Sequence, residues 1–133
     1  MTILVKDAFV YTGAGFDKLD ILIKNSFIHT IGTSISSDGV DCVFNAQNKY
    51  LVPGFVDVHV HLREPGFFYK ESILTGTKAA AAGGYTAVCA MPNIDPVPDC
   101  VENIKVEQDI IDRDAVVGVY PFASITKGRK GGG

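Results

Sequence analysis

The sequence has few cysteines and no long apolar run, and both absences narrow the class of protein. Its three cysteines, Cys42, Cys89 and Cys100, are widely spaced and form no Cys-x-x-Cys pair, so neither a disulfide framework nor a zinc ribbon is expected. No segment reaches the roughly eighteen consecutive apolar residues that a membrane span needs. The first segment, MTILVKDAFV, lacks the apolar core and cleavage site of a signal peptide. We therefore expect a cytoplasmic protein without a membrane span.

The numbers of basic and acidic residues are also nearly balanced. The chain holds 12 basic and 15 acidic residues, for a formal net charge of -3 at pH 7, and no basic run is long enough to follow a phosphate backbone. We therefore expect no nucleic-acid partner. Hydrophobic residues make up 47% of the chain and charged residues only 20%, which predicts a globular protein with a buried core.

Residues 2–51 have the pattern of short strands separated by turns. The segments ILVKDAFVY, DILIKNSFIHTIG and DCVFNAQNKYLV mix apolar and polar residues, and turn residues gather in TGAG and SSDG. This pattern predicts a small antiparallel sheet, which we interpret as part of a β-sandwich over residues 1–52. From PGFVDVHVHL onward valine is frequent, as in strands that helices cover, so we expect a domain boundary near Pro53.

Residues 53–133 alternate between strand and helix patterns. The strand-like segments are PGFVDVHVHL, YTAVCAMPN and AVVGVYPFAS, and the helix-like segments are YKESILTGTKAAAAGG and PDCVENIKVEQDIIDRD. Gly83 and Gly84 should end the first helix. The second helix offers an apolar side made of Val101, Ile104, Ile110 and Ile111. The order predicts an α/β unit with parallel strands joined by right-handed crossovers.

Such an alternation fits either an open doubly wound sheet or the first part of a (β/α)8 barrel. A dinucleotide-binding sheet carries a glycine-rich turn directly after its first strand, whereas HLREPGFF stands there in this sequence. In a barrel the chemical groups lie at the carboxyl ends of the strands, where His59, His61, Arg63 and Asn93 fall. We therefore favour a TIM-type barrel, incomplete because a whole barrel takes about 250 residues.

The segment DVHVHLREPG places two of the chain's three histidines one residue apart. Because side chains alternate along a strand, the segment should have one polar and one apolar face. The polar face would hold Asp57, His59, His61 and Arg63, and the apolar face would hold Val56, Val58, Val60 and Leu62. The spacing therefore brings two imidazoles to the same side of one strand.

Two imidazoles on one strand face can reach a single divalent ion, so His59 and His61 are candidate metal ligands. Zinc is the first expectation for imidazole ligands, and manganese, iron and cobalt stay open as alternatives. A second interpretation makes one histidine a core residue bonded to a backbone carbonyl and the other a solvent-facing residue. We assign Asp57 to support of the ligands or to packing at the strand, not to direct catalysis. We expect His29, in NSFIHTIG, to lie at the surface.

The segment PGFVDVHVHLREPG, followed by TGTKAAAAGGYTAVCAMPN, resembles the metal-dependent amidohydrolases, and among them the bacterial dihydroorotases most closely. The resemblance implies that His59 and His61 bind the more buried zinc of a one- or two-metal site. It also implies that Arg63 and Asn93 bind the substrate carboxylate. A guanidinium fork and an amide NH2 suit that role. The alternatives are a surface ion pair of Arg63 with Glu64 or Glu71 and a turn role for Asn93.

The resemblance further implies an activity, the zinc-dependent reversible cyclisation of N-carbamoyl-L-aspartate to dihydroorotate in pyrimidine biosynthesis. The expected partners are that small acidic substrate and either further copies of the chain or aspartate carbamoyltransferase. Allantoinases and hydantoinases share the His-x-His motif. The combination of Arg63 with Met91-Pro92-Asn93 favours a dihydroorotase over both.

The family pattern also implies a bridging carboxylate, two more histidine ligands and a catalytic aspartate on later barrel strands. Residues 1–133 offer no candidates for these groups, so we expect no catalytic residue in this chain and no activity from it alone. The alternative is a noncatalytic relative or fragment that lends a binding surface to a partner. The coding sequence after Gly133 would discriminate between the two interpretations.

Overall fold

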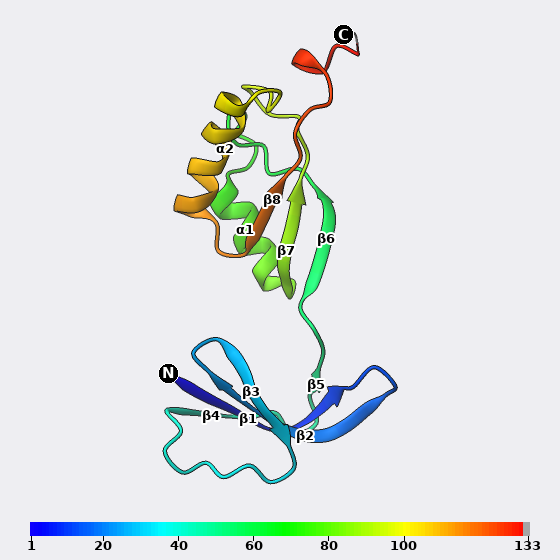
Figure 1. The fold of residues 1–133 in the computed structure, drawn as a ribbon, viewed down its shortest axis with the longest axis vertical. Helices are drawn as coiled ribbons and strands as arrows, with labels where there is room; N and C mark the ends of the chain where they lie inside the picture. The colour runs from blue at the N-terminus through cyan, green and yellow to red at the C-terminus, as the bar shows by residue number, and fades with distance from the viewer. Residues whose placement is uncertain (132–133) are drawn as a thin grey trace. The chain divides into compact units, whose positions relative to one another are not determined.

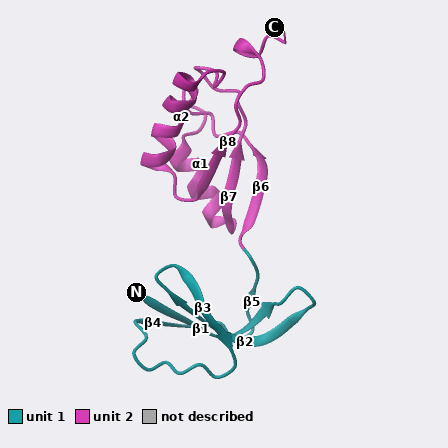
Figure 2. Cartoon of the chain, viewed as in Figure 1, with its two compact units in different colours: residues 1–53 teal, residues 54–133 magenta. Residues whose placement is uncertain are grey.

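The computed structural model describes residues 1–131, which form two compact units. The first unit is Met1–Pro53 and the second begins at Gly54 (Figure 2). Figure 1 shows that the first unit consists of strands, whereas the second combines strands with helices. In the described residues, none of the helices has both the length and the apolar character needed to cross a bilayer.

The first unit is a five-stranded mixed sheet. Its strands are β1 (Thr2–Tyr11), β2 (Phe16–Lys24), β3 (Phe27–Gly32), β4 (Cys42–Asn45) and β5 (Tyr50–Leu51). The order is β3-β2-β1-β4, and β5 also pairs with β1. The pairs β1–β2 and β2–β3 are antiparallel, but β4 and β5 both run parallel to β1. The expectation of an antiparallel sheet is therefore wrong for β4 and β5, because the chain after β3 crosses the sheet before it returns beside β1.

Two of the segments expected as single strands are divided in the structure. DILIKNSFIHTIG forms the hairpin of β2 and β3, because Asn25 and Ser26 adopt φ values of 50° and 67°. Positive φ at both central residues is the geometry of a tight hairpin turn, which asparagine tolerates better than most residues. DCVFNAQNKYLV similarly separates into β4 and β5, with Asn48 at φ 63° between them. In both segments the turn residues therefore end one strand before the next begins, although the apolar pattern alone indicates a continuous strand.

The second unit is built on a parallel sheet of three strands in the order β6-β7-β8. The strands are β6 (Phe55–Val60), β7 (Tyr85–Ala90) and β8 (Gly118–Pro121), and the helices between them are α1 (Ile73–Ala82) and α2 (Val101–Asp114). A short 3-10 turn, η1 (Lys127–Arg129), follows β8. Both pairings are parallel, and Figure 1 shows α1 and α2 on one side of the sheet. The expected strand–helix alternation is confirmed.

The core of the second unit lies between the sheet and the two helices. Its buried members are Leu62, Ile73, Val88, Ala90, Ile111 and Val119. The opposite face of the sheet is open, since Val58 is 66% exposed and Tyr120 is 62% exposed. Apolar residues on a sheet face that no helix covers are expected where a barrel interior would lie.

Helix α1 ends at the predicted glycines but begins at Ile73, four residues after the start of the predicted segment. Ser72 caps its first turn by accepting the N–H of Thr75 (3.1 Å), and Thr75 Oγ1 accepts the N–H of Ser72 (3.0 Å), which completes a capping box. Gly84 follows the helix at φ 86°, a conformation that glycine adopts without strain. Gly76 lets the helix approach the sheet closely, because a Cβ there would lie 2.6 Å from Leu62 Cδ2.

The apolar side of α2 differs from the expected one. Ile111 is buried as expected, but Val101 is 77% exposed at the first turn. The position that is buried instead is Glu107, whose side chain is 1% exposed. In the described residues its Oε2 atom has no hydrogen-bond partner, and burial raises the pKa of Glu107 from its usual 4.5 to about 7. Because Glu107 is a charged residue, the helix pattern gave no indication that its position belongs to the core.

We expect the buried Glu107 carboxyl to make the free energy of unfolding depend on pH. Below its unfolded pKa of 4.5 the group is protonated in both states, and no penalty arises. As the pH rises toward about 7, the unfolded chain loses the proton first, so the free energy of unfolding falls. Glu107→Gln should remove this fall and stabilise the chain above pH 7 by roughly 2–3 kcal/mol.

The measurement is urea unfolding of both proteins across this pH range. Glu102→Gln makes the same change at an exposed position of the same helix and should leave the pH dependence in place. A pH profile that is identical in wild type and Glu107→Gln would contradict the assignment.

Candidate metal and substrate site

A bulge in β6 determines where the side chains of DVHVHLREPG lie. Asp57 is opposite Val88 and Val60 is opposite Ala90, so β6 contains one more residue than β7 between these pairs. The Asp57 carboxylate accepts the N–H of His59 at 3.0 Å within this bulge. The regular alternation assumed from the sequence is therefore broken between Asp57 and Val60.

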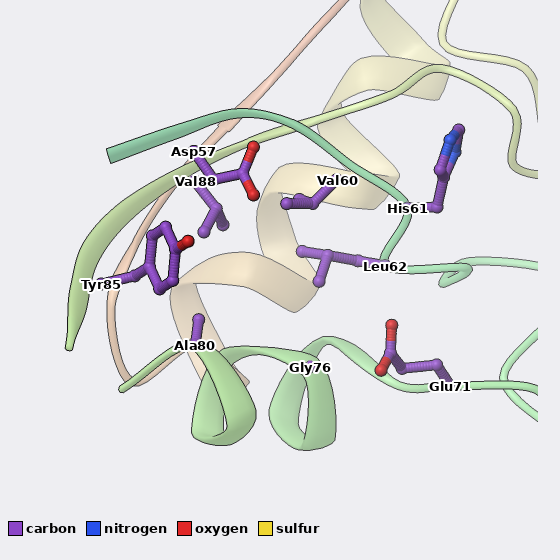
Figure 3. Close-up of a pocket in the computed structure, with 9 residues that line it drawn as sticks. All are labelled: Asp57, Val60, His61, Leu62, Glu71, Gly76, Ala80, Tyr85 and Val88. Atoms are coloured by element: carbon purple, nitrogen blue, oxygen red, sulfur yellow. The ribbon is translucent and has the colours of Figure 1, made fainter. Parts of the chain in front are cut away.

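Because of the bulge, neither the polar face nor the apolar face predicted for this strand is as the regular alternation gave it. Asp57 lines the same pocket as Val60 and Leu62 (Figure 3), although the regular alternation had assigned it to the face opposite these two residues. Val60 and Leu62 belong to the core, whereas Val56 and Val58 are exposed. The apolar residues thus divide between the helix-covered side and the open side of the sheet.

The two histidines lie together at the carboxyl end of β6. Their ring centroids are 5.2 Å apart and their planes are inclined by 70°. Both side chains are exposed. Zinc–nitrogen bonds are ~2.0–2.1 Å long, and this separation allows one nitrogen of each ring to reach a common ion. The metal-ligand role of His59 and His61 stays a prediction, which this ring separation does not contradict.

A hydrogen bond joins His61 to Asn93, which follows β7. Nδ1 of His61 lies 2.8 Å from Oδ1 of Asn93. In the tautomer that donates from Nδ1 to the carboxamide oxygen, Nε2 keeps its lone pair for another ligand. The NH2 group of Asn93 keeps its donors for another ligand. The structure thus brings His61 and Asn93, which were predicted as site residues after different strands, into contact.

Arg63 follows the histidines in an unusual backbone conformation. Its φ is 64°, in the left-handed region that residues other than glycine seldom adopt. Its carbonyl accepts the N–H of Phe67 at 2.9 Å. In residues 1–131 no ion pair joins Arg63 to Glu64 or Glu71, and the Glu64 carboxylate instead accepts the N–H of Ile73 at 2.8 Å. The half-buried guanidinium is thus not used by the alternative ion pair.

A pocket of about 220 Å³ lies between β6, β7 and α1. Its lining is mainly apolar, with Asp57 and Glu71 as its carboxylates (Figure 3). Of the four predicted site residues only His61 borders this pocket. The pocket therefore lies on the helix side of the sheet, and the four residues do not converge in it.

The described part of the chain contains no cluster of three or more His, Cys, Asp or Glu side chains able to hold a metal. The two imidazoles of His59 and His61 thus stand without a third such ligand beside them in the described residues. His29 is exposed on β3 and contacts Thr30 Oγ1 at 2.9 Å, as expected for a surface residue. Sequence reasoning missed the hydrogen bond from the Ile73 N–H to the Glu64 carboxylate, although an acidic residue shortly before a capped helix was a usable signal.

Solved structures with the same fold include hydantoinases. An L-hydantoinase (dihydropyrimidinase) from Arthrobacter aurescens superposes with a TM-score of 0.83 at 22% identity, over 91% of this chain and 27% of that one. A D-hydantoinase (dihydropyrimidinase) from a Thermus species superposes with a TM-score of 0.77 at 27% identity, over 96% of this chain and 30% of that one. The fold is therefore that of the N-terminal part of an amidohydrolase barrel protein.

The sequence comparison defines the family more narrowly. Residues 48–133 match the family described as Dihydro-orotase-like, and the chain belongs to this family. A dihydroorotase of Enterococcus faecalis is 53% identical over 105 residues, which are 79% of this chain and 25% of the relative. A dihydroorotase of Staphylococcus aureus is 52% identical over 124 residues, which are 92% of this chain and 29% of the relative. The chain thus spans between a quarter and a third of these relatives.

The His61–Asn93 bond generates a prediction about zinc affinity. Asn93→Ala removes the acceptor that fixes the His61 ring, so zinc should bind about 10–100-fold more weakly. Asn93→Asp retains an oxygen acceptor and should keep most of the affinity. Competition with a chromophoric chelator measures both. Equal affinities for wild type and Asn93→Ala would show that the bond does not orient a ligand.

Proposed function

We propose that the protein to which these residues belong is a zinc-dependent dihydroorotase, which interconverts N-carbamoyl-L-aspartate and dihydroorotate. Membership in the Dihydro-orotase-like family supports the reaction class. The observation that carries the proposal is the 2.8 Å bond between His61 and Asn93. It links a residue suited to hold the metal with a residue suited to bind the substrate carboxylate.

The donor set of the site fits zinc. His59 and His61 offer two imidazoles whose ring centroids are 5.2 Å apart, and imidazole nitrogen is a common zinc ligand. The chemistry that a bound zinc supplies is Lewis-acid polarisation of the ring amide carbonyl. The part played by this chain is to hold the ion, with Asn93 fixing the orientation of His61.

Substrate recognition is assigned to Arg63 and Asn93. Dihydroorotate and carbamoyl-aspartate both carry carboxylates, which a guanidinium binds through two parallel hydrogen bonds. With Oδ1 of Asn93 engaged by His61, the NH2 group of Asn93 supplies neutral donors beside that cation. Metal ligand and carboxylate receptor would thus be held in a fixed relation.

The remaining expectations stay predictions. They are a cytoplasmic location, self-association, and association with aspartate carbamoyltransferase. The carboxylate, histidines and aspartate that the resemblance implies would have to come from outside residues 1–133.

We expect Arg63→Lys to weaken substrate binding in the complete protein. Lysine keeps the charge but loses the bidentate fork, a loss of about 1.5–3 kcal/mol for a charge-assisted bond. The Michaelis constant for carbamoyl-aspartate should therefore rise about 10–100-fold, with zinc content unchanged. Arg113→Lys makes the same exchange on the exposed side of α2 and should change neither. An unaltered Michaelis constant in Arg63→Lys would refute the assignment of Arg63.

Residues 1–133 alone should show no measurable turnover. Two imidazoles leave a tetrahedral zinc short of protein ligands, and a positioned general base is typically worth ~10²–10⁴-fold in rate. The test is to purify the chain, add zinc and follow carbamoyl-aspartate cyclisation beside gel filtration. Zinc-dependent turnover by a clean monomer would mean that these residues hold the missing groups.

A further inference from the structure

The segment Leu62–Gly66 holds Arg63 in a backbone conformation that needs support from its neighbours. An arginine at a φ of 64° lies in a sparsely populated region. Such conformations persist where surrounding contacts over-determine them. The residues on either side of Arg63 show how this segment is fixed.

Three contacts fix the segment. Leu62 is buried against Gly76 of α1, where a Cβ would lie 2.6 Å from Leu62 Cδ2. Gly66, at φ 93°, lies so close to Asp95 that a Cβ would be 2.5 Å from the Asp95 carbonyl oxygen. Between these contacts, Glu64 Oε2 accepts the N–H of Ile73 at 2.8 Å. Arg63 is thus held by a neighbour on each side.

The Glu64 contact is the only one of the three made by a charged group. Ile73 is the first residue of α1 and is fully buried, so its amide is a fixed point of the core. The amides of a first helical turn lack partners within the helix. A carboxylate there gains both a charge-assisted hydrogen bond and the favourable end of the helix dipole. Glu64 thereby ties the residue after Arg63 to a rigid element.

The same segment is tied to the loop that follows β7. The Asp95 N–H donates to the Pro65 carbonyl at 3.2 Å. Asn93 stands two residues before Asp95 and bonds His61. The two loops are therefore joined at both ends, and Arg63 and Asn93 belong to one connected frame.

We propose that Glu64 is a positioning residue for substrate binding, which anchors the Arg63 loop to the first amide of α1 and so fixes the direction of the guanidinium. The proposal rests on the function assigned above to Arg63. Glu64 itself contacts no substrate. Its effect passes through the backbone of the adjacent residue.

The test compares Glu64→Ala, Glu64→Gln and the control Ser72→Ala in the complete zinc-loaded protein. Ser72→Ala weakens the same helix end by removing its cap, but it leaves the Arg63 loop untouched. Glu64→Ala should raise the Michaelis constant for carbamoyl-aspartate about tenfold, with kcat and zinc content nearly unchanged. Glu64→Gln keeps an oxygen acceptor and should restore most of the affinity.

Hydrogen exchange provides a measurement that does not depend on turnover. The Phe67 amide donates to the Arg63 carbonyl at 2.9 Å, so its exchange rate reports whether the loop is held. Glu64→Ala should accelerate exchange at Phe67 about tenfold or more, whereas Ser72→Ala should accelerate it at Thr75 instead.

The outcomes separate the two proposals. If the wild-type protein does not act on carbamoyl-aspartate, the proposed function fails, whatever the exchange rates are. If the wild type is active and Glu64→Ala changes neither the Michaelis constant nor Phe67 exchange, the positioning role is overturned. It is also overturned if Ser72→Ala raises the Michaelis constant as much as Glu64→Ala does, because helix stability alone would then explain the effect.

Discussion

The hydrogen bond from the His59 N–H to the Asp57 carboxylate closes the bulge on which the arrangement of the site depends. Without the extra residue in β6, side chains would alternate strictly from Asp57 onward. The bulge instead permits Asp57 to face α1 together with Val60 and Leu62. His59 and His61 are left near each other, with their ring centroids 5.2 Å apart. A short local contact of the backbone thus places the two imidazoles, and the core beneath them keeps its apolar packing.

The candidate site also depends on contacts between two loops, one after β6 and one after β7. The loop after β6 carries His61 and Arg63, and the loop after β7 carries Asn93. They are joined by the His61–Asn93 bond and by the close approach of Gly66 to Asp95. Groups supported in this way keep their geometry before any ligand arrives, which lowers the cost of ordering them. The polar residues of the site are therefore best understood as one network.

The sequence predicts the elements of the second unit well, because their signals are local. Gly83 and Gly84 mark the end of α1, and valine-rich segments mark the strands of a helix-covered sheet. The positions of His59, His61 and Asn93 at strand ends follow from the same alternation. The bulge could not be predicted, since a period-two pattern contains no sign of an inserted residue. The buried Glu107 was missed because helical periodicity assigns charged residues to the solvent side.

The first unit shows a different limit. The residues of β4 and β5 favour extended structure, but their parallel pairing with β1 depends on how the chain crosses after β3. Nothing local to Cys42–Asn45 or Tyr50–Leu51 specifies that direction. The hairpin at Asn25 and Ser26 is made by local residues, but their positive φ values appear only in the structure, and the apolar pattern around them had indicated a single strand. The strand propensity of these segments could therefore be predicted, whereas neither the turn that divides β2 from β3 nor the direction of β4 and β5 was.

The contact between Gly76 and Leu62 has a consequence for how this sequence can vary. A side chain at position 76 would occupy the space of Leu62, so a larger residue there requires a smaller one at position 62. Leu62 in turn stands between His61 and Arg63 in the chain. Substitutions at position 76 are thus limited by its contact with Leu62, whose neighbours in the chain belong to the candidate site. Across related chains, these two positions should change together or not at all.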